Sequence, residues 1–260
     1  MHRAPSRTEG SPGVPPAGMV RPFLTARWES LILLNYVCPA DLLIPLVPAG
    51  TQLDTWNGQP LISLVGFLFA DACVRGVPIP FHRRFEEVNL RFYVRRTLTD
   101  DTIRRAVVFI REFVPRFAIA AVARWAYNEP YVAVPMRHRR TLTREDGGEV
   151  EYTWCHRHND FSLGGRATGP AQPVRPESQA EFITEHYWGY TRQRDGSTLE
   201  YQVEHPSWEV WETTESHFRG PGQQLYGSGF GTVLAGPPWS AHLAVGSAVA
   251  VHPGRRLSCR

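Results

Sequence analysis

The sequence predicts a single mainly β domain with a few helices, of the α+β class. The 260 residues include 22 glycines and 22 prolines, which suits a fold with many turns and argues against a helical bundle. Between these turn residues lie segments in which apolar and polar residues alternate, as in half-buried strands. Apolar residues make up 42%, enough for a sizeable core. We expect a disordered Pro/Gly tail over 1–20 and one domain over 21–255.

The clearest expected strand is 84–96, in which Val88, Leu90 and Phe92 alternate with polar side chains. Residues 103–113 follow a turn at Asp100–Asp101, so the two segments should pair as a hairpin. Further strands are expected at 31–37, 50–54, 61–74, 131–143, 149–158, 160–167, 198–205, 208–217 and 241–252.

Three helices are expected. The first is short and spans 39–48, the second covers 115–127 and starts at a proline, and the third follows Ser178 as its N-cap. Two glycine clusters, GSGFG at 227–231 and Gly164–Gly165, lack the lysine and the strand–helix setting of a phosphate-binding loop. We interpret both as turns.

Charge and composition exclude several classes of partner. The formal net charge is only +3, which gives no case for nucleic acid. No apolar run approaches the ~20 residues that span a bilayer, and the first 20 residues lack a signal peptide's apolar stretch. The four cysteines have no CxxC spacing. We expect a cytoplasmic protein with no membrane partner, no cofactor and no metal.

Several segments carry a family resemblance. FEEVNLRFYVRR (85–96) fits the pattern F-x-E-x-N-x-R-x-Y-V, and CPADLLIPLVPAG, VVFIREFVPRFAI, EFITEHYWGY and VEHPSWEV occur with it in order. Over 23–255 the chain resembles a YqjF-like bacterial family of unknown function, domain of unknown function 2071. That family is similar in fold to acetoacetate decarboxylase, which implies an antiparallel β-cone or barrel with a central pocket and flanking helices.

The resemblance does not carry over the decarboxylase chemistry. Those enzymes form a Schiff base through a buried lysine, and all 28 basic residues of this chain are arginines. Arg116 falls near the expected lysine position, but a guanidinium stays protonated near neutral pH. We therefore expect no Schiff-base decarboxylation.

The candidate binding residues start with Glu87, Asn89 and Arg91, whose spacing of two places them on one strand face. We expect this face to line the central cavity, with Val88, Leu90 and Phe92 packing against Phe117 and Trp125 of helix 115–127. Because a buried charge needs a partner, we expect Arg111 of the adjacent strand beside Glu87, and a carboxylate or bound anion beside Arg91. A solvated strand face is the alternative.

Histidines supply the remaining candidates. His186 follows the third helix, and His205 follows Glu204, a carboxylate of the kind that can set an imidazole's pKa. Both are candidate substrate-binding residues. His156 and His158 share an expected strand face and could hold a metal, but no third ligand lies nearby in sequence. We interpret that pair as surface histidines.

Three functions remain open from the sequence. The first is an enzyme acting on a small organic acid or ketone without lysine, and the second is a non-catalytic barrel that binds a small ligand. The third is a scaffold protein without a ligand. Clustered buried ionisable groups would favour the enzyme, and an apolar lumen with one polar anchor would favour the binder. The sequence leaves open whether the chain forms a homo-oligomer.

Overall fold

The computed structural model describes residues 21–78, 83–115 and 128–257. It confirms the mainly β class. The large sheet runs β16-β1-β3-β5-β6-β12-β13, and β13 pairs again with β16, so the sheet closes on itself. These strands are β1 (Leu24–Val37), β3 (Leu61–Val74), β5 (Phe85–Thr97), β6 (Ile103–Val114), β12 (Trp188–Arg192), β13 (Thr198–Glu204) and β16 (Ser240–Val251).

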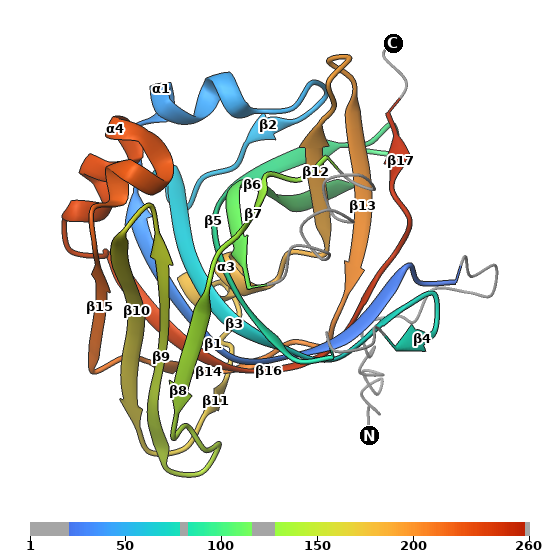
Figure 1. Cartoon of the computed structure of the whole chain (residues 1–260). Coiled ribbons are helices and arrows are strands. Elements are labelled where there is room, and N and C mark those ends of the chain that lie inside the picture. Colours follow the sequence, from blue (N-terminus) through green and yellow to red (C-terminus); the bar gives the residue numbers. More distant parts are fainter. Residues whose placement is uncertain (1–20, 79–82, 116–127, 258–260) are drawn as a thin grey trace, which may run out of the picture.

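Short strands extend this sheet, and a second sheet lies beside it (Figure 1). The short strands are β2 (Gln52–Leu53), β4 (Val77–Pro78), β7 (Tyr131–Ala133), β11 (Gln172–Pro173), β14 (Glu209–Glu212) and β17 (Arg255–Arg256). The second sheet has the order β15-β10-β9-β8 and consists of β8 (Met136–Arg140), β9 (Gly147–His156), β10 (Asn159–Thr168) and β15 (Glu215–Arg219).

The helices described are short. α1 (Ala40–Leu43) continues into a 3₁₀ turn over Ile44–Leu46, α3 covers Gln179–Thr184, and α4 covers Gly222–Ala235. The predicted cap of α3 is confirmed, since the Ser178 hydroxyl accepts a hydrogen bond from the Glu181 amide at 3.2 Å. Within the described ranges, no helix has the length and apolarity needed to cross a membrane.

Strand β5 separates two cores. Its even-numbered residues, among them Val88, Leu90 and Phe92, belong to a cluster with Tyr152 and Trp154 of the second sheet and with apolar residues of α4. Its odd-numbered face, which carries Tyr93, belongs with Phe182 and Ile183 of α3 to another cluster. In Figure 1, α3 lies within the curl of the large sheet. The odd-numbered face therefore packs in what we call the inner core, and the even-numbered face packs in the outer core.

Some predictions need correction. The described partners of Val88, Leu90 and Phe92 are the second sheet and α4; helix 115–127, with Arg116, Phe117 and Trp125, lies outside the described residues, as does tail 1–20. GSGFG is not a turn but part of α4, which kinks at Gly227 with φ 83°. Gly164–Gly165 lies inside β10.

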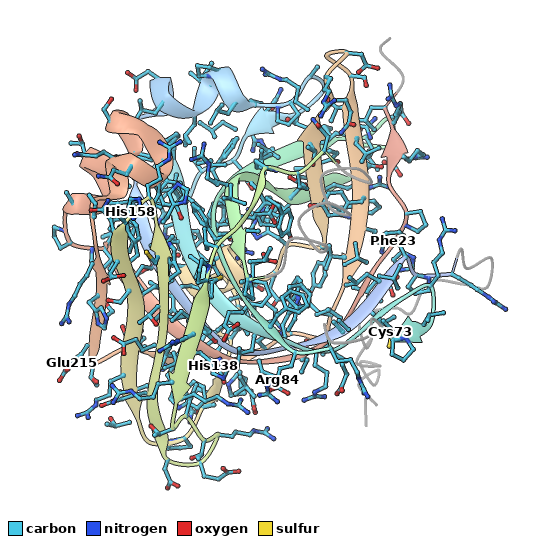
Figure 2. All side chains as sticks on the ribbon, in the orientation of Figure 1. Phe23, Cys73, Arg84, His138, His158 and Glu215 are labelled. Atoms are coloured by element: carbon cyan, nitrogen blue, oxygen red, sulfur yellow. The ribbon has the colours of Figure 1, made fainter. Side chains whose placement is uncertain are left out.

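His156 and His158 do not share a strand face. β9 ends at His156, and Arg157 and His158 form the turn to β10 with φ values of 49° and 64°. In Figure 2, His158 lies at the end of the second sheet beside α4. Strand β12 was not predicted at all.

Candidate functional site

The inner face of β5 buries three polar side chains in a row. Glu87 and Asn89 are 2% exposed and Arg91 is 9% exposed. Alternation along the strand directs all three toward α3, because their even-numbered neighbours fill the other core. They do not lie on a solvated face. Whether they bind a substrate stays a prediction.

The register of β6 and β7 brings further polar groups to this row. Asn89 pairs with Glu112 of β6, and Glu112 pairs in turn with Tyr131 of β7. The Tyr131 hydroxyl donates to Glu87 Oε2 at 3.0 Å, and Asn89 Nδ2 donates to Glu87 Oε1 at 3.0 Å. Tyr131 also lies near enough to Glu112 to lower the pKa of that carboxyl group, and Glu112 Oε2 has no partner among the described residues. One tyrosine thus donates to one buried carboxyl group and is the strand neighbour of another.

A third carboxyl group, that of Glu129, stands beside this pair. Glu129 is 5% exposed, and its Oε1 accepts a hydrogen bond from the Tyr201 hydroxyl at 2.9 Å and another from Thr191. Tyr201 lies on β13 and Thr191 on β12. The strands that hold the three carboxyl groups and their partners are neighbours in the large sheet, in the order β5-β6-β12-β13, with β7 paired to β6.

Burial dominates the electrostatics of this carboxyl cluster, which we define as Glu87, Glu112 and Glu129. Burial raises the pKa of Glu87 from 4.5 to about 7, although hydrogen bonds from Asn89 and Tyr131 oppose the shift. Burial likewise raises the pKa of Glu129 to about 7. The pKa of Glu112 lies well above its usual value because burial and then the charges of Glu129 and Glu87 disfavour ionisation. The cluster is therefore partly protonated near neutral pH.

Arg91 and His186 form a second polar group on the same face. One Arg91 amino group donates to the Ile183 carbonyl of α3 at 3.0 Å, while its buried Nε has no partner within the described ranges. His186 is 7% exposed, both of its ring nitrogens lack described partners, and its ring lies 4.7 Å from that of Tyr93. Burial, with the nearby charge of Arg91, holds the pKa of His186 well below its usual value.

One predicted site residue, Arg111, lies differently from the expectation. Arg111 is not the partner of Glu87, because it pairs with Leu90 and donates to the Leu225 carbonyl of α4 in the outer core. Within the described ranges no carboxylate forms an ion pair with Arg91, so the other expected partner, a bound anion, stays a prediction. His205 is half-buried, its ring stacked on Trp208 at 4.6 Å, and Nδ1 donates to the Pro206 carbonyl at 2.9 Å.

Sequence reasoning missed Glu112, Glu129 and Tyr131. Glu112 carried a usable signal, because a lone carboxylate in the apolar strand VVFIREFV needs a buried partner. Glu129 and Tyr131 follow the predicted helix 115–127 in sequence and carry no comparable pattern. Across the described parts of the chain, no three His, Cys, Asp or Glu side chains are arranged to hold a metal ion.

Comparison with known proteins places this chain in a family. The sequence pattern of the DUF2071 family, described as "Uncharacterized conserved protein", matches residues 25–248. The chain is 28% identical over 184 residues to the uncharacterized protein YqjF of Bacillus subtilis, covering 69% of this chain and 72% of that one.

Solved structures share the fold at low sequence identity. Acetoacetate decarboxylase from Legionella pneumophila superposes with a TM-score of 0.62 at 12% identity, covering 96% of this chain and 93% of its own. The enduracididine biosynthesis enzyme MppR, in complex with pyruvate, gives a TM-score of 0.64 at 12% identity, with 93% of each chain covered. An acetoacetate decarboxylase-like enzyme from Sphingomonas wittichii gives 0.59 at 14% identity, covering 97% of this chain and 100% of its own. The chain therefore belongs to the DUF2071 family and has an acetoacetate decarboxylase-like fold.

Proposed function

We propose that this protein is an enzyme that moves a proton at the carbon next to the carbonyl of a small oxo acid. The observation that carries the proposal is that Glu87 of the buried carboxyl cluster shares one face of β5 with Arg91, which has no ion pair among the described residues. Arg91 supplies a positive charge for the substrate carboxylate. Glu87 supplies a base whose pKa of about 7 suits proton transfer near neutral pH.

The hydrogen bonds suggest a role for each member of the cluster. Glu87 in its ionised form takes the proton from carbon, and the electron pair moves onto the carbonyl oxygen as an enolate. Burial holds the pKa of Tyr131 well above its usual value, so its hydroxyl stays protonated and can donate. Glu112, whose own pKa is raised, keeps a proton next to Tyr131. Glu112, Tyr131 and Glu87 therefore form a chain along which a proton can return.

The chemistry must proceed without an imine. The chain contains no lysine, so the Schiff-base route is closed to it. Borohydride added with a keto acid should therefore trap no substrate at an internal residue. One of the structural neighbours is an enzyme complexed with pyruvate, which supports pyruvate as the first probe.

The test is deuterium exchange into the pyruvate methyl group in D₂O, followed by proton NMR. We expect the protein to accelerate exchange, Glu87→Gln to abolish the acceleration, and Arg91→Gln to reduce it mainly through a higher KM. Arg137→Gln, at an exposed arginine of β8, is the matched control and should behave as wild type. No acceleration with pyruvate or acetoacetate, or full activity in Glu87→Gln, would overturn the proposal.

A non-catalytic binding site is the second candidate. Phe67, Val65 and Phe182 belong to the apolar inner core, and Arg91 donates to the Ile183 carbonyl beside it, an arrangement that suits a largely apolar site with one polar anchor. In that case pyruvate should raise the melting temperature of the wild type and of Glu87→Gln equally. Arg91→Ala should lose this stabilisation whether the protein is an enzyme or a non-catalytic binder. The deuterium-exchange assay is therefore the measurement that separates these two functions.

A further inference from the structure

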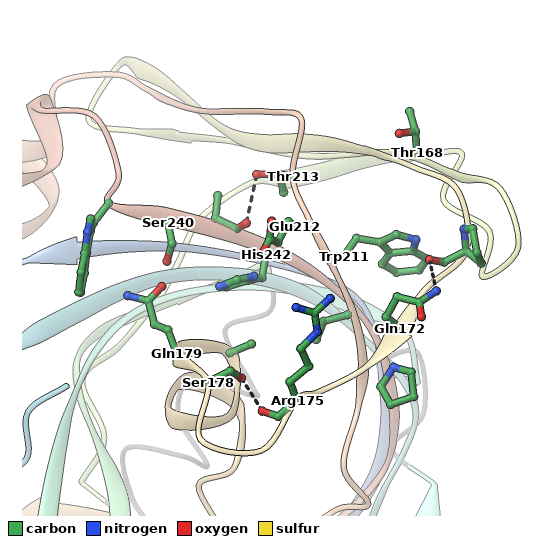
Figure 3. Close-up of a pocket in the computed structure, with 16 residues that line it drawn as sticks. Thr168, Gln172, Arg175, Ser178, Gln179, Trp211, Glu212, Thr213, Ser240 and His242 are labelled. Carbon is green, nitrogen blue, oxygen red and sulfur yellow. Dashed lines mark hydrogen bonds between the residues drawn. The ribbon is translucent and has the colours of Figure 1, made fainter. Parts of the chain in front are cut away.

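A pocket of about 730 Å³ lies away from the carboxyl cluster, between strands β11, β14 and β16 and the start of α3 (Figure 3). This volume is within the range of small-molecule sites, which is roughly 300–1,000 Å³. Arg175, Ser178 and Gln179 approach it from the α3 side, and Trp211 and His242 approach from the strands.

His242 is the buried polar group of this pocket. It is 6% exposed, and neither of its ring nitrogens has a hydrogen-bond partner among the described residues. Buried polar groups almost always have a partner, so an unpaired imidazole that lines a pocket indicates a missing one. Burial lowers the pKa of His242, although Glu212 opposes the shift from the paired position across β14 and β16. A neutral imidazole presents one donor and one acceptor.

Arg175 and Trp211 complete the recognition surface. Arg175 is exposed in the loop before α3, and its guanidinium makes no ion pair within the described ranges. Trp211 is 5% exposed and donates its indole N–H to the Gly169 carbonyl at 2.9 Å. This hydrogen bond fixes the ring, so what the indole offers the pocket is apolar surface rather than a polar atom.

We propose that this pocket binds a small aromatic monocarboxylate. Arg175 would pair with the carboxylate, His242 would donate its N–H to the same anion, and the ligand ring would pack on Trp211. Glu212 at the pocket edge limits the negative charge that the pocket accepts, which favours one carboxylate over a polyanion.

The test is calorimetric titration of the full-length protein with benzoate, with benzamide as the neutral isostere. We expect saturable benzoate binding, with benzamide and the Arg175→Gln variant each weaker by about tenfold or more, because a charge-assisted bond is lost. Arg137→Gln, at an exposed arginine outside the pocket, should bind as wild type. Equal affinity for benzoate and benzamide, or for wild type and Arg175→Gln, would overturn the proposal.

Two further measurements keep the outcome unambiguous. The imidazole NMR signal of His242 is identified as the one that disappears in His242→Gln, and circular dichroism verifies that this variant is folded. Benzoate should shift that signal in the wild type. Benzoate binding that leaves the signal unmoved would contradict a role for His242. Glu87→Gln should bind benzoate as wild type does, because the carboxyl cluster lies elsewhere. Failure of this proposal can therefore be told apart from failure of the proposed enzyme activity.

Discussion

Glu87, Glu112 and Glu129 are buried carboxyl groups, and burial raises the pKa of each above 4.5. A carboxyl group whose folded pKa is raised binds more protons in the folded state than in the unfolded state. Its contribution to stability is fully present below about pH 4.5 and is lost as the pH rises through the folded pKa, which is about 7 for Glu87 and Glu129. The protein should therefore lose stability between pH 5 and pH 8.

Replacing Glu112 by glutamine removes the carboxyl group whose ionisation is opposed by both burial and its neighbours. We expect Glu112→Gln to be more stable than wild type at pH 8, by about 1–3 kcal/mol, and nearly equal at pH 5. Urea unfolding at both pH values measures this difference. Glu145→Gln, at an exposed glutamate, is the control and should show no such dependence. A Glu112→Gln variant that is destabilised equally at both pH values would contradict the account.

Single residues also show where sequence reasoning reaches its limit. Arg111 and Glu112 are neighbours on β6, so their side chains point to opposite faces. The sequence predicts Arg111 as the partner of Glu87, but the residue of β6 that faces the inner core is its neighbour Glu112. A bulge between Leu90 and Arg91 shifts the register of the hairpin, and the alternating pattern of β5 alone does not reveal it.

At the scale of elements, strands with regular alternation were predictable and glycine-rich segments were not. β5 and β6 were expected as a hairpin and pair as one. α4 was missed because GSGFG resembles a turn by composition, whereas packing of Leu225, Phe230 and Leu234 into the outer core holds the kinked helix. The sequence predicts a turn at Gly164 and Gly165, because it does not show how closely the neighbouring strands β9 and β15 approach β10.

The two sheets meet closely at Gly66 of β3. A Cβ atom there would lie 2.7 Å from Cδ2 of Tyr152, a fully buried side chain whose hydroxyl donates to the Ser30 carbonyl at 2.8 Å. Tyr152 is held at both ends, so it has little room to move away. Glycine at this position therefore lets the second sheet pack against β3.

We expect Gly66→Ala to destabilise the protein by about 1–3 kcal/mol, as overpacking of a core does. Chemical denaturation gives the free energy of unfolding. Gly236→Ala is the matched control. Its added Cβ would lie 3.5 Å from the Val233 carbonyl oxygen, and its φ of −80° is accessible to alanine. A loss in Gly66→Ala no larger than in Gly236→Ala would show that the sheets do not pack as described.

At the scale of the whole molecule, Glu200 joins strands that lie far apart in the sequence. Its carboxylate, 2% exposed, accepts hydrogen bonds from Arg96 of β5 at 2.9 Å, Arg104 of β6 at 2.8 Å and Arg255 of β17 at 2.9 Å. Burial alone would raise the pKa of Glu200, but the bonds from Arg255 and its other donors outweigh it and lower that pKa. One carboxylate thus ties β13 to β5, β6 and β17.

Glu200→Gln should destabilise the protein by about 1–3 kcal/mol, because several arginines lose their shared acceptor while keeping partial access to water. The free energy of unfolding from urea denaturation at pH 7 measures the effect. Glu209→Gln, which removes the more exposed pair with Arg144, should cost less than about 1 kcal/mol. Equal losses in the two variants would mean that Glu200 does not hold β13 to β5 and β6.

The whole-molecule fold was predictable because the resemblance spans nearly the entire chain, whereas the carboxyl cluster was not. Glu87, Glu112 and Glu129 lie on three separate segments of sequence, and only the pairing of β5, β6 and β7 brings the first two together. Closure of the sheet through β12 and β13 then supplies the hydroxyl partners of Glu129.

The pH dependence of pyruvate deuterium exchange tests the central claim most directly. If ionised Glu87 is the base, the catalysed rate should rise with pH through about 7, the pKa that burial gives this carboxyl group. The rise should vanish in Glu87→Gln and persist in Arg137→Gln. A rate that stays at the uncatalysed level at every pH, or a rise that survives in Glu87→Gln, would contradict the assignment of this cluster as an acid–base site.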